Sequence, residues 1–386
     1  MIQAATYLLI ARDAGPALFS IIAATAGAVL VAQAVSDLGV STYLIRERAR
    51  EYKSVHLTAA LRVNSYTSWA LTFLALAVFL ATGWIYDSTY FSLIPICLWV
   101  GGDRLIETRL GLELADGRAH VVAVSLLLRR SVALAVYIIL ISIGESVLLS
   151  FAVSFSAGTL VGLGHLLRSG AGAGLVAREP ISGAVLASVL RRCRPFWFNT
   201  AASQLRNLDT LIVTGIGGNA VGGLYGVVAR SIGPFRILAT SLAAVLLPAA
   251  VRTGRAGVET IRRPVSLLLG SLVLLYGIAV LLMPPVVLAL LGEQYVPAIV
   301  PLQIVVAGLI FAATASVLTS LLQAGNREWI VGYIAASASV LSLGLCAIGV
   351  YYHGIVGAAI GVSLGFVLQC AMLLAAFFFG EKDFHQ

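Results

Sequence analysis

The residues of this chain with the clearest chemical potential are arginines that interrupt long apolar segments. Arg129 and Arg130 interrupt one such segment, and Arg206 and Arg230 interrupt two others. A cation at bilayer depth costs about 3 kcal/mol even on insertion scales, so it normally faces a partner, a cavity or a substrate. A guanidinium stays charged and can hold two phosphate oxygens at once. These four residues therefore predict a substrate-binding cavity that favours anions.

One further polar residue joins this predicted set. Asn199 precedes Arg206 by seven residues, which places both side chains on one face of a continuous helix. Of Arg230 and Arg236, which face different directions on a helix, Arg230 is the preferred cavity residue. An alternative stays open for the buried arginines: Asp209, three residues after Arg206, could form an ion pair that only fixes helix packing.

A second group of charges lies within residues 90–113. Arg104 and Glu107 are three residues apart and could form an ion pair. Asp103 and Glu107 lie one helical turn apart, and two like charges in a dry site favour proton uptake by one of them. Asp103, Arg104, Glu107 and Asp209 are therefore candidates for either a coupling site or an ion-pair network.

The composition determines which elements must position these residues. Apolar residues make up 60% of the 386 residues, charged residues only 11%, and the mean hydropathy is +0.98. A soluble domain has roughly 25% charged residues, so a soluble protein with one large core is excluded. We predict an all-α, polytopic membrane protein with about twelve transmembrane helices. The expected helices cover residues 1–11, 16–38, 63–85, 90–113, 121–143, 147–167, 195–214, 220–248, 265–290, 298–323, 329–351 and 355–379.

The connections between these helices alternate sharply in charge. One set is rich in arginine and lysine, and the other has Arg12 as its only cation. The positive-inside rule places the first set, and with it both termini, in the cytoplasm. The first helix, about eleven residues before Arg12, is too short to span the hydrocarbon core, and we expect an N-terminal piece to be missing.

The chain also shows signs of an internal duplication. The segment around Phe19 resembles the segment around Tyr225 (225 − 19 = 206), and Gly117 corresponds to Gly325 (325 − 117 = 208). Six helices in each copy give both copies the same orientation, which predicts a parallel repeat. The expected organisation is a six-helix lobe at 1–168, a cytoplasmic linker with an amphipathic lead-in at 169–194, and a six-helix lobe at 195–386.

Four regions carry a resemblance to a known family. They are GPALFS (15–20) with DLGVSTYLIRE (37–47), DTLIV (209–213) with AVGGLY (220–225), LLGEQYVPA (290–298), and YHGIVGAAI (352–360). In this order and spacing they are similar to motifs of the Wzx-type polysaccharide flippase family, within the multidrug, oligosaccharidyl-lipid and polysaccharide exporter superfamily.

The resemblance implies two six-helix lobes around a central cavity that opens alternately to each side of a bacterial cytoplasmic membrane. It implies a lipid-linked oligosaccharide as substrate, usually on undecaprenyl diphosphate, moved to the outer leaflet for cell-surface polysaccharide synthesis. A polysaccharide polymerase or a glycosyltransferase complex would be a partner.

Other classes of function receive less support from the sequence. No Walker A motif and no metal-ligand spacing of histidines is present, so we expect no enzyme activity and no cofactor. The basic loops account for the net charge of +8 without nucleic acid. Two alternatives remain. One is an ion-coupled exporter of drugs or metabolites, which would need an acidic cavity to bind organic cations. The other is a membrane-embedded glycan polymerase or ligase, which would need a larger outer loop.

Overall fold

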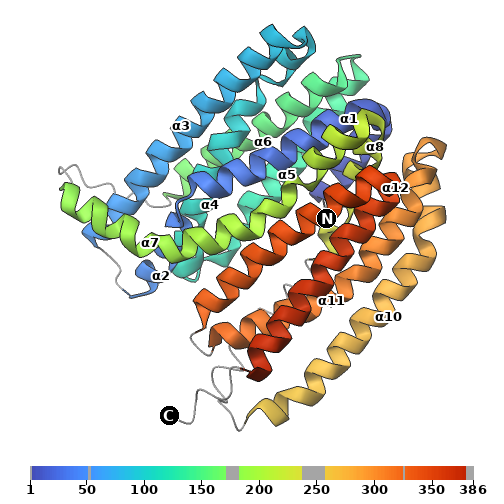
Figure 1. Cartoon of the computed structure of the whole chain (residues 1–386). Helices are drawn as coiled ribbons and strands as arrows, with labels where there is room; N and C mark the ends of the chain where they lie inside the picture. Colours follow the sequence, from blue (N-terminus) through green and yellow to red (C-terminus); the bar gives the residue numbers. More distant parts are fainter. Residues whose placement is uncertain (1, 51–53, 171–181, 237–256, 325–326, 380–386) are drawn as a thin grey trace. The chain divides into compact units, whose positions relative to one another are not determined.

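The computed structural model describes residues 2–50, 54–170, 182–236, 257–324 and 327–379, and every regular element in these ranges is helical. The predicted all-α membrane fold is therefore confirmed (Figure 1). Residues 171–181 of the expected linker and the end of the expected helix 220–248 lie outside the described residues. The elements are α1 (Ile2–Ser36), α2 (Val40–Arg50), α3 (Val55–Ile85), η1 (Ser88–Leu93), α4 (Ile96–Ala115), α5 (Ala119–Ser142), α6 (Val147–Ser169), α7 (Gly183–Gln204), η3 (Leu205–Leu208), α8 (Asp209–Ser231), α10 (Gly257–Leu291), η4 (Glu293–Ala298), α11 (Ile299–Ala324) and α12 (Glu328–Phe379).

Three of these helices are broken by a glycine in a non-helical conformation. The breaks lie at Gly15 in α1 (φ 68°, ψ 167°), at Gly218 in α8 (φ 80°, ψ 174°) and at Gly354 in α12 (φ 57°, ψ −141°). A positive φ is available to glycine at little cost, so these positions suit a sharp change of chain direction. Each break falls in a connection that the sequence predicts. Helices α1 and α12 each correspond to two of the expected helices, whereas α8 joins the end of the expected helix 195–214 to the beginning of the expected helix 220–248.

The break in α12 reverses the chain. A Cβ atom at Gly361 would lie 2.5 Å from the backbone of Leu345, and one at Gly349 would overlap the carbonyl oxygen of Gly357. Such contacts require two antiparallel arms whose backbones approach closely, as small residues allow in membrane helices. Figure 1 shows the two arms of α12 running side by side.

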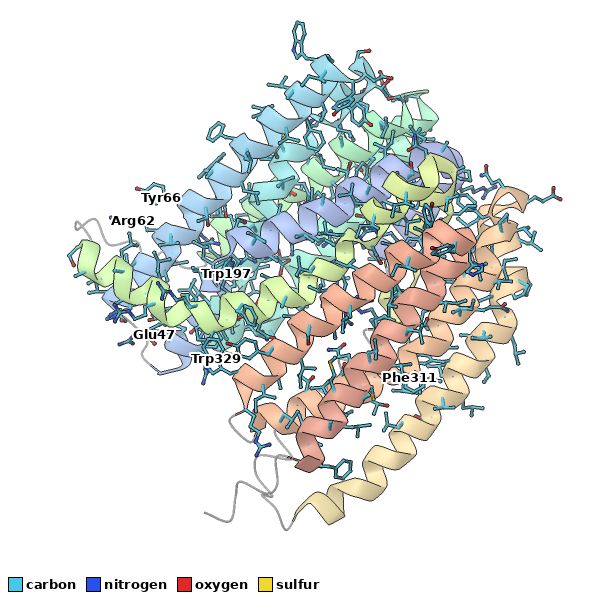
Figure 2. The ribbon with its side chains drawn as sticks, in the orientation of Figure 1. Glu47, Arg62, Tyr66, Trp197, Phe311 and Trp329 are labelled. Atoms are coloured by element: carbon cyan, nitrogen blue, oxygen red, sulfur yellow. The ribbon has the colours of Figure 1, made fainter. Side chains whose placement is uncertain are left out.

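Eight helical stretches among the described residues are long and apolar enough to cross a membrane. They include α3, which exposes the aromatic side chains Tyr66, Trp69 and Phe73; Tyr66 is labelled in Figure 2. Lipid is as apolar as these side chains, so their exposure is expected on a bilayer-facing helix. The charged helix α4 is not among the eight. It carries Asp103, Arg104, Glu107, Arg109 and Glu113.

The chain divides into two compact units. Apart from Met1 and Ile2, one unit combines residues 3–28 with 205–386, and the other contains residues 29–204. The sequence assigns residues 3–28 to the N-terminal lobe instead. The predicted lobe boundaries at 168 and 195 remain a prediction.

Within the first unit, the second arm of α1 packs against the second arm of α8. A Cβ atom at Gly223 would overlap the carbonyl oxygen of Pro16, and one at Gly226 would lie 2.6 Å from the Cβ atom of Ala23 and 3.3 Å from the ring of Phe19. Glycine at these positions lets the helix backbones approach closely.

The residues that meet in this contact are related by a constant offset. Pro16 faces Gly223 and Phe19 faces Gly226 (223 − 16 = 226 − 19 = 207), which matches the spacing of the repeat in the sequence. The short helices η1 and η4 begin with a similar separation (293 − 88 = 205). Because the residue numbers of the two contacting arms rise in the same direction, the arms run parallel, which agrees with a parallel duplication.

This close packing can be tested at Gly223. We expect Gly223→Ala to lower the melting temperature of the purified protein, because relieving the overlap with Pro16 requires a backbone shift that costs about 1–3 kcal/mol. Gly215→Ala, in the first arm of α8, is the matched control, since a Cβ atom there has no neighbour within 4 Å. Equal melting temperatures for the two variants would contradict the contact.

Candidate functional site

The charged residues of the transmembrane helices form two groups, one in each compact unit. The first group centres on Arg129 of α5, whose side chain is 3% exposed. Its Nη1 atom lies 2.6 Å from Oδ1 of Asp103, and its Nη2 atom lies 2.5 Å from Oε1 of Glu107. The two carboxylates stand one turn apart on α4, so a single guanidinium can bind both with separate nitrogens. The structure thus joins three predicted site residues in one ion-pair cluster.

Helix α6 makes room for the Arg129 side chain. A Cβ atom at Gly162 would lie 2.8 Å from Cγ of Arg129, and one at Gly158 would lie 2.6 Å from the Arg129 carbonyl oxygen. The aliphatic part of the side chain therefore lies against Gly162 and the backbone of Arg129 against Gly158, while the guanidinium contacts α4. Arg129 connects three helices.

Arg104 extends this group toward α1 and α2. It forms an ion pair with Asp37 and donates a hydrogen bond to Oγ of Ser41 at 2.7 Å. Ser41 is also 2.7 Å from Oγ1 of Thr108, which accepts a hydrogen bond from Asn64 at 2.9 Å. The sequence spacing allows an ion pair between Arg104 and Glu107. In the structure Glu107 instead accepts a hydrogen bond from Arg129, and it interacts with Arg104 only electrostatically.

The first group is balanced in charge. Arg130 also interacts electrostatically with Asp103. Three cations therefore stand against three carboxylates: Arg104, Arg129 and Arg130 against Asp37, Asp103 and Glu107. Substrate binding by Arg129 and Arg130 stays a prediction, and the ion pairs of Arg129 favour the alternative of a charge that fixes helix packing.

The structural role of Arg129 predicts a large loss of stability on truncation. Arg129→Ala leaves two carboxylates without their cation, and breaking a buried ion pair costs about 3–5 kcal/mol. We expect a much lower melting temperature for this variant than for Leu127→Ala, a truncation of an exposed side chain on the same helix. The triple variant with Arg129→Met, Asp103→Asn and Glu107→Gln should recover most of the loss, because it removes the charges together. A stable Arg129→Ala protein would refute the role.

Outside the transmembrane segments, a further ion pair attaches α2 to the end of α4. Arg48 binds Asp116 with two hydrogen bonds, Nε to Oδ1 at 2.7 Å and Nη2 to Oδ2 at 2.8 Å. These bonds from Arg48 hold the pKa of the Asp116 carboxyl below its usual value. Nearby, Trp197 of α7, labelled in Figure 2, donates from Nε1 to the Val35 carbonyl oxygen at 2.8 Å. Two cations predicted as topological signals, Arg48 and Arg118, therefore also form ion pairs, since Arg118 lies 2.9 Å from Glu113.

The lowered pKa of Asp116 predicts a pH-dependent contribution to stability. A carboxyl with a depressed folded pKa stabilises the fold above its unfolded pKa of about 3.9, and this stabilisation is lost as pH falls through the folded value. We expect Asp116→Asn to melt below wild type near neutral pH, with the difference shrinking toward about pH 3. A pH series of melting curves measures it. A difference that is constant across the series would show that the carboxyl charge contributes nothing.

The second group lies in the other unit and begins with Arg206. The sequence expects one continuous α-helix through residues 195–214, but α7 ends at Gln204 and Arg206 lies in the 3₁₀ helix η3. The common face of Asn199 and Arg206 stays a prediction, because two 3₁₀ steps in place of α-helical ones turn Arg206 by only about 40° relative to Asn199. Nη2 of Arg206 donates to Oε1 of Gln369 at 2.7 Å, and its guanidinium carbon lies 5.5 Å from the ring centre of Phe366.

Arg230 reaches the same segment from α8. Its Nη2 atom donates to the carbonyl oxygen of Ala23 at 2.7 Å, and its guanidinium lies 5.7 Å from the ring centre of Tyr7. Gly27 shows how close the elements are: a Cβ atom there would lie 3.2 Å from Nη2 of Arg230 and would overlap the carbonyl oxygen of Asn207. Arg230 therefore lies beside the backbone that carries Arg206.

Asp209 completes this group without an ion pair to Arg206. Its Oδ2 atom accepts a hydrogen bond from the Tyr225 hydroxyl at 2.9 Å, and its Oδ1 atom accepts from the backbone N–H of Thr210 at 2.6 Å. Arg230 and Arg236 both interact with this carboxylate electrostatically.

The second group carries a surplus of positive charge. Arg230 and Arg236 interact electrostatically with Asp209, and Arg236 also acts on Arg206, so these four side chains together carry a net charge of +2. Such a group can attract an anion, whereas the balanced first group cannot do so to the same extent. The sequence identifies the arginines of both groups but misses Gln369 and Tyr225, because amides and tyrosines in apolar helices carry no signal of their own. Among the described residues no cluster of histidine, cysteine or acidic side chains could hold a metal ion.

The fold of this chain is similar to that of several solved structures. The inward-facing form of a multidrug resistance MATE family transporter of the MOP superfamily aligns with a TM-score of 0.74 at 14% identity, over 99% of this chain and 93% of that chain. The lipid II flippase MurJ in an inward closed conformation aligns with a TM-score of 0.70 at 12% identity, over 97% and 85%. A MOP superfamily transporter from Pyrococcus furiosus, described by the reverse polarity of its binding pocket, aligns with a TM-score of 0.66 at 14% identity, over 98% and 90%. No family model and no curated protein sequence matches the chain.

Proposed function

We propose that this chain is a flippase that moves a lipid-linked oligosaccharide, carried on a prenyl diphosphate, across a bacterial cytoplasmic membrane by alternating access. The observation that carries the proposal is the net charge of +2 held among Arg206, Asp209, Arg230 and Arg236. The fold shared with a lipid II flippase and with MATE transporters supports a transporter over an enzyme.

The second group suits a diphosphate for a physical reason. A diphosphate that links a lipid to a sugar is a dianion, so its charge equals the surplus of the group in magnitude. Each of Arg206 and Arg230 uses Nη2 for a protein acceptor, and in the part of the chain that the structure describes their Nε atoms have no hydrogen-bond partner. Unused donors of an arginine can bind phosphate oxygens, which are strong acceptors.

The same charge argues against export of organic cations, the main form of the exporter alternative. A cation would be repelled by a group with a surplus of two positive charges, and like-charge juxtaposition costs several kcal/mol. The Pyrococcus furiosus transporter is described by a reversed pocket polarity, which indicates that the sign of a pocket varies within this fold. A polymerase or ligase receives no support from these neighbours.

The remaining expectations follow from the proposal. Both termini would lie in the cytoplasm, and a polysaccharide polymerase or a glycosyltransferase complex would be the partner. Asn199, Arg129 and Arg130 stay candidates for contacts with the substrate, but the proposal rests on Arg206 and Arg230.

Binding of a simple prenyl diphosphate tests the proposal. We expect Arg206→Ala and Arg230→Ala to weaken binding of geranylgeranyl diphosphate to the purified protein by about 10- to 100-fold, since hydrogen bonds to charged groups contribute about 1.5–3 kcal/mol. Arg168→Ala, which removes a cation from the last turn of α6, is the charge-matched control. Microscale thermophoresis in detergent measures the affinities. Equal affinities for all variants, or no binding by wild type, would contradict the proposed function.

A further inference from the structure

The carboxylate of Asp209 is held in place by uncharged groups. Its two oxygens accept hydrogen bonds from the Tyr225 hydroxyl and from the backbone and side chain of Thr210. Tyr225 is 1% exposed, so this anchor is fixed by packing. Asp209 is also the first residue of α8, where the helix N-terminus favours a negative charge. The carboxylate therefore has a stable position that requires no contact with an arginine.

The arginines around Asp209 are held by uncharged groups as well. Arg206 bonds to the amide of Gln369 and lies over Phe366, and Arg230 bonds to the carbonyl of Ala23 and lies over Tyr7. Asp209 and Arg230 thus lie close enough to interact electrostatically, while each is held by neutral partners.

The other unit shows the contrasting arrangement. There Arg129 contacts Asp103 and Glu107 directly, and the guanidinium is neutralised by the two carboxylates. Direct pairing of Asp209 with an arginine would consume the donors that an anionic ligand needs. The carboxylate of Asp209 lies near the arginines but is hydrogen-bonded to other groups. It therefore lowers the positive potential of the arginines and leaves their N–H donors unused.

We infer that Asp209 is a fixed counter-charge that limits how tightly the arginine group binds an anionic headgroup, and so allows its release. The inference rests on the proposed function and names a residue that determines specificity and turnover. A flippase must release its substrate in every cycle, and without the negative charge of Asp209 the neighbouring arginines would hold a dianion more tightly. Since a Coulomb energy scales with the charge of the ligand, Asp209 acts more strongly on a diphosphate than on a monophosphate.

Neutralising Asp209 should therefore strengthen binding. In Asp209→Asn the amide oxygen can still accept from Thr210, and the amide nitrogen can donate to the Tyr225 oxygen. We expect this variant to bind geranylgeranyl diphosphate about tenfold more tightly than wild type, a change of about 1.4 kcal/mol, with slower dissociation. Geranylgeranyl monophosphate, with a charge of about −2 against about −3 for the diphosphate, should gain only about fivefold. A merely structural role for Asp209 would predict weaker binding.

Two further variants complete the experiment. Asp209→Ser also removes the charge and suits the start of a helix, so it serves if Asp209→Asn does not fold. Glu145→Gln is the matched control, because it neutralises an exposed carboxylate of the other unit, outside both charged groups, and should not tighten binding. Tyr225→Phe keeps the charge but removes its anchor, and it should weaken binding as the carboxylate approaches the arginines.

The outcomes separate the inference from the proposed function. Tighter diphosphate binding by either neutral Asp209 variant, with the smaller gain for the monophosphate, supports the inference. Unchanged or weaker binding by a folded Asp209 variant overturns it, while the wild-type affinity still upholds the proposed function. Wild type without measurable affinity for the diphosphate overturns both, because the headgroup is then not the ligand and Asp209 has no binding to limit.

Discussion

A guanidinium inside an apolar helix has no water to solvate it, and this constraint decides what each arginine of the protein can do. Two solutions occur. Arg129 is neutralised by two carboxylates of α4, whereas Arg206 and Arg230 are held by a side-chain amide, a backbone carbonyl and aromatic rings. In the first solution the carboxylates neutralise the positive charge of Arg129, which is then not available to bind another anion. The second keeps it, because a neutral acceptor orients a cation without cancelling it.

The glycine contact between α1 and α8 makes the second solution possible. Gly223 and Gly226 let α8 approach α1, which brings Arg230 to the carbonyl of Ala23. Any larger residue at Gly27 would separate Arg230 from the segment that carries Arg206 and Asp209. The fold of this unit and its charged group therefore depend on the same small residues.

The sequence predicts the helical architecture well because apolar length and glycine breaks are local properties. The turns at Gly15, Gly218 and Gly354 all fall in predicted connections. The partners of the charges are not local: Arg206 bonds to a residue 163 positions away. The 3₁₀ turn at Leu205–Leu208 was not predicted either, because a pattern of apolar residues does not distinguish a 3₁₀ turn from an α-helical turn.

The sign of the net charge in such a group can differ between proteins that share this fold. Solved structures with this architecture share only 12–14% identity with the chain, and one is described by a reversed pocket polarity. Helix packing through glycine and apolar contacts places no demand on charge, so replacing a few residues changes the sign without changing the fold. Here those residues include Arg230 and Asp209, whose neutral anchors keep opposite charges close without a direct ion pair between them. Since a direct ion pair would cancel the charge as it does at Arg129, these neutral anchors keep the charge of Arg206 and Arg230 available for the anion that we propose as substrate.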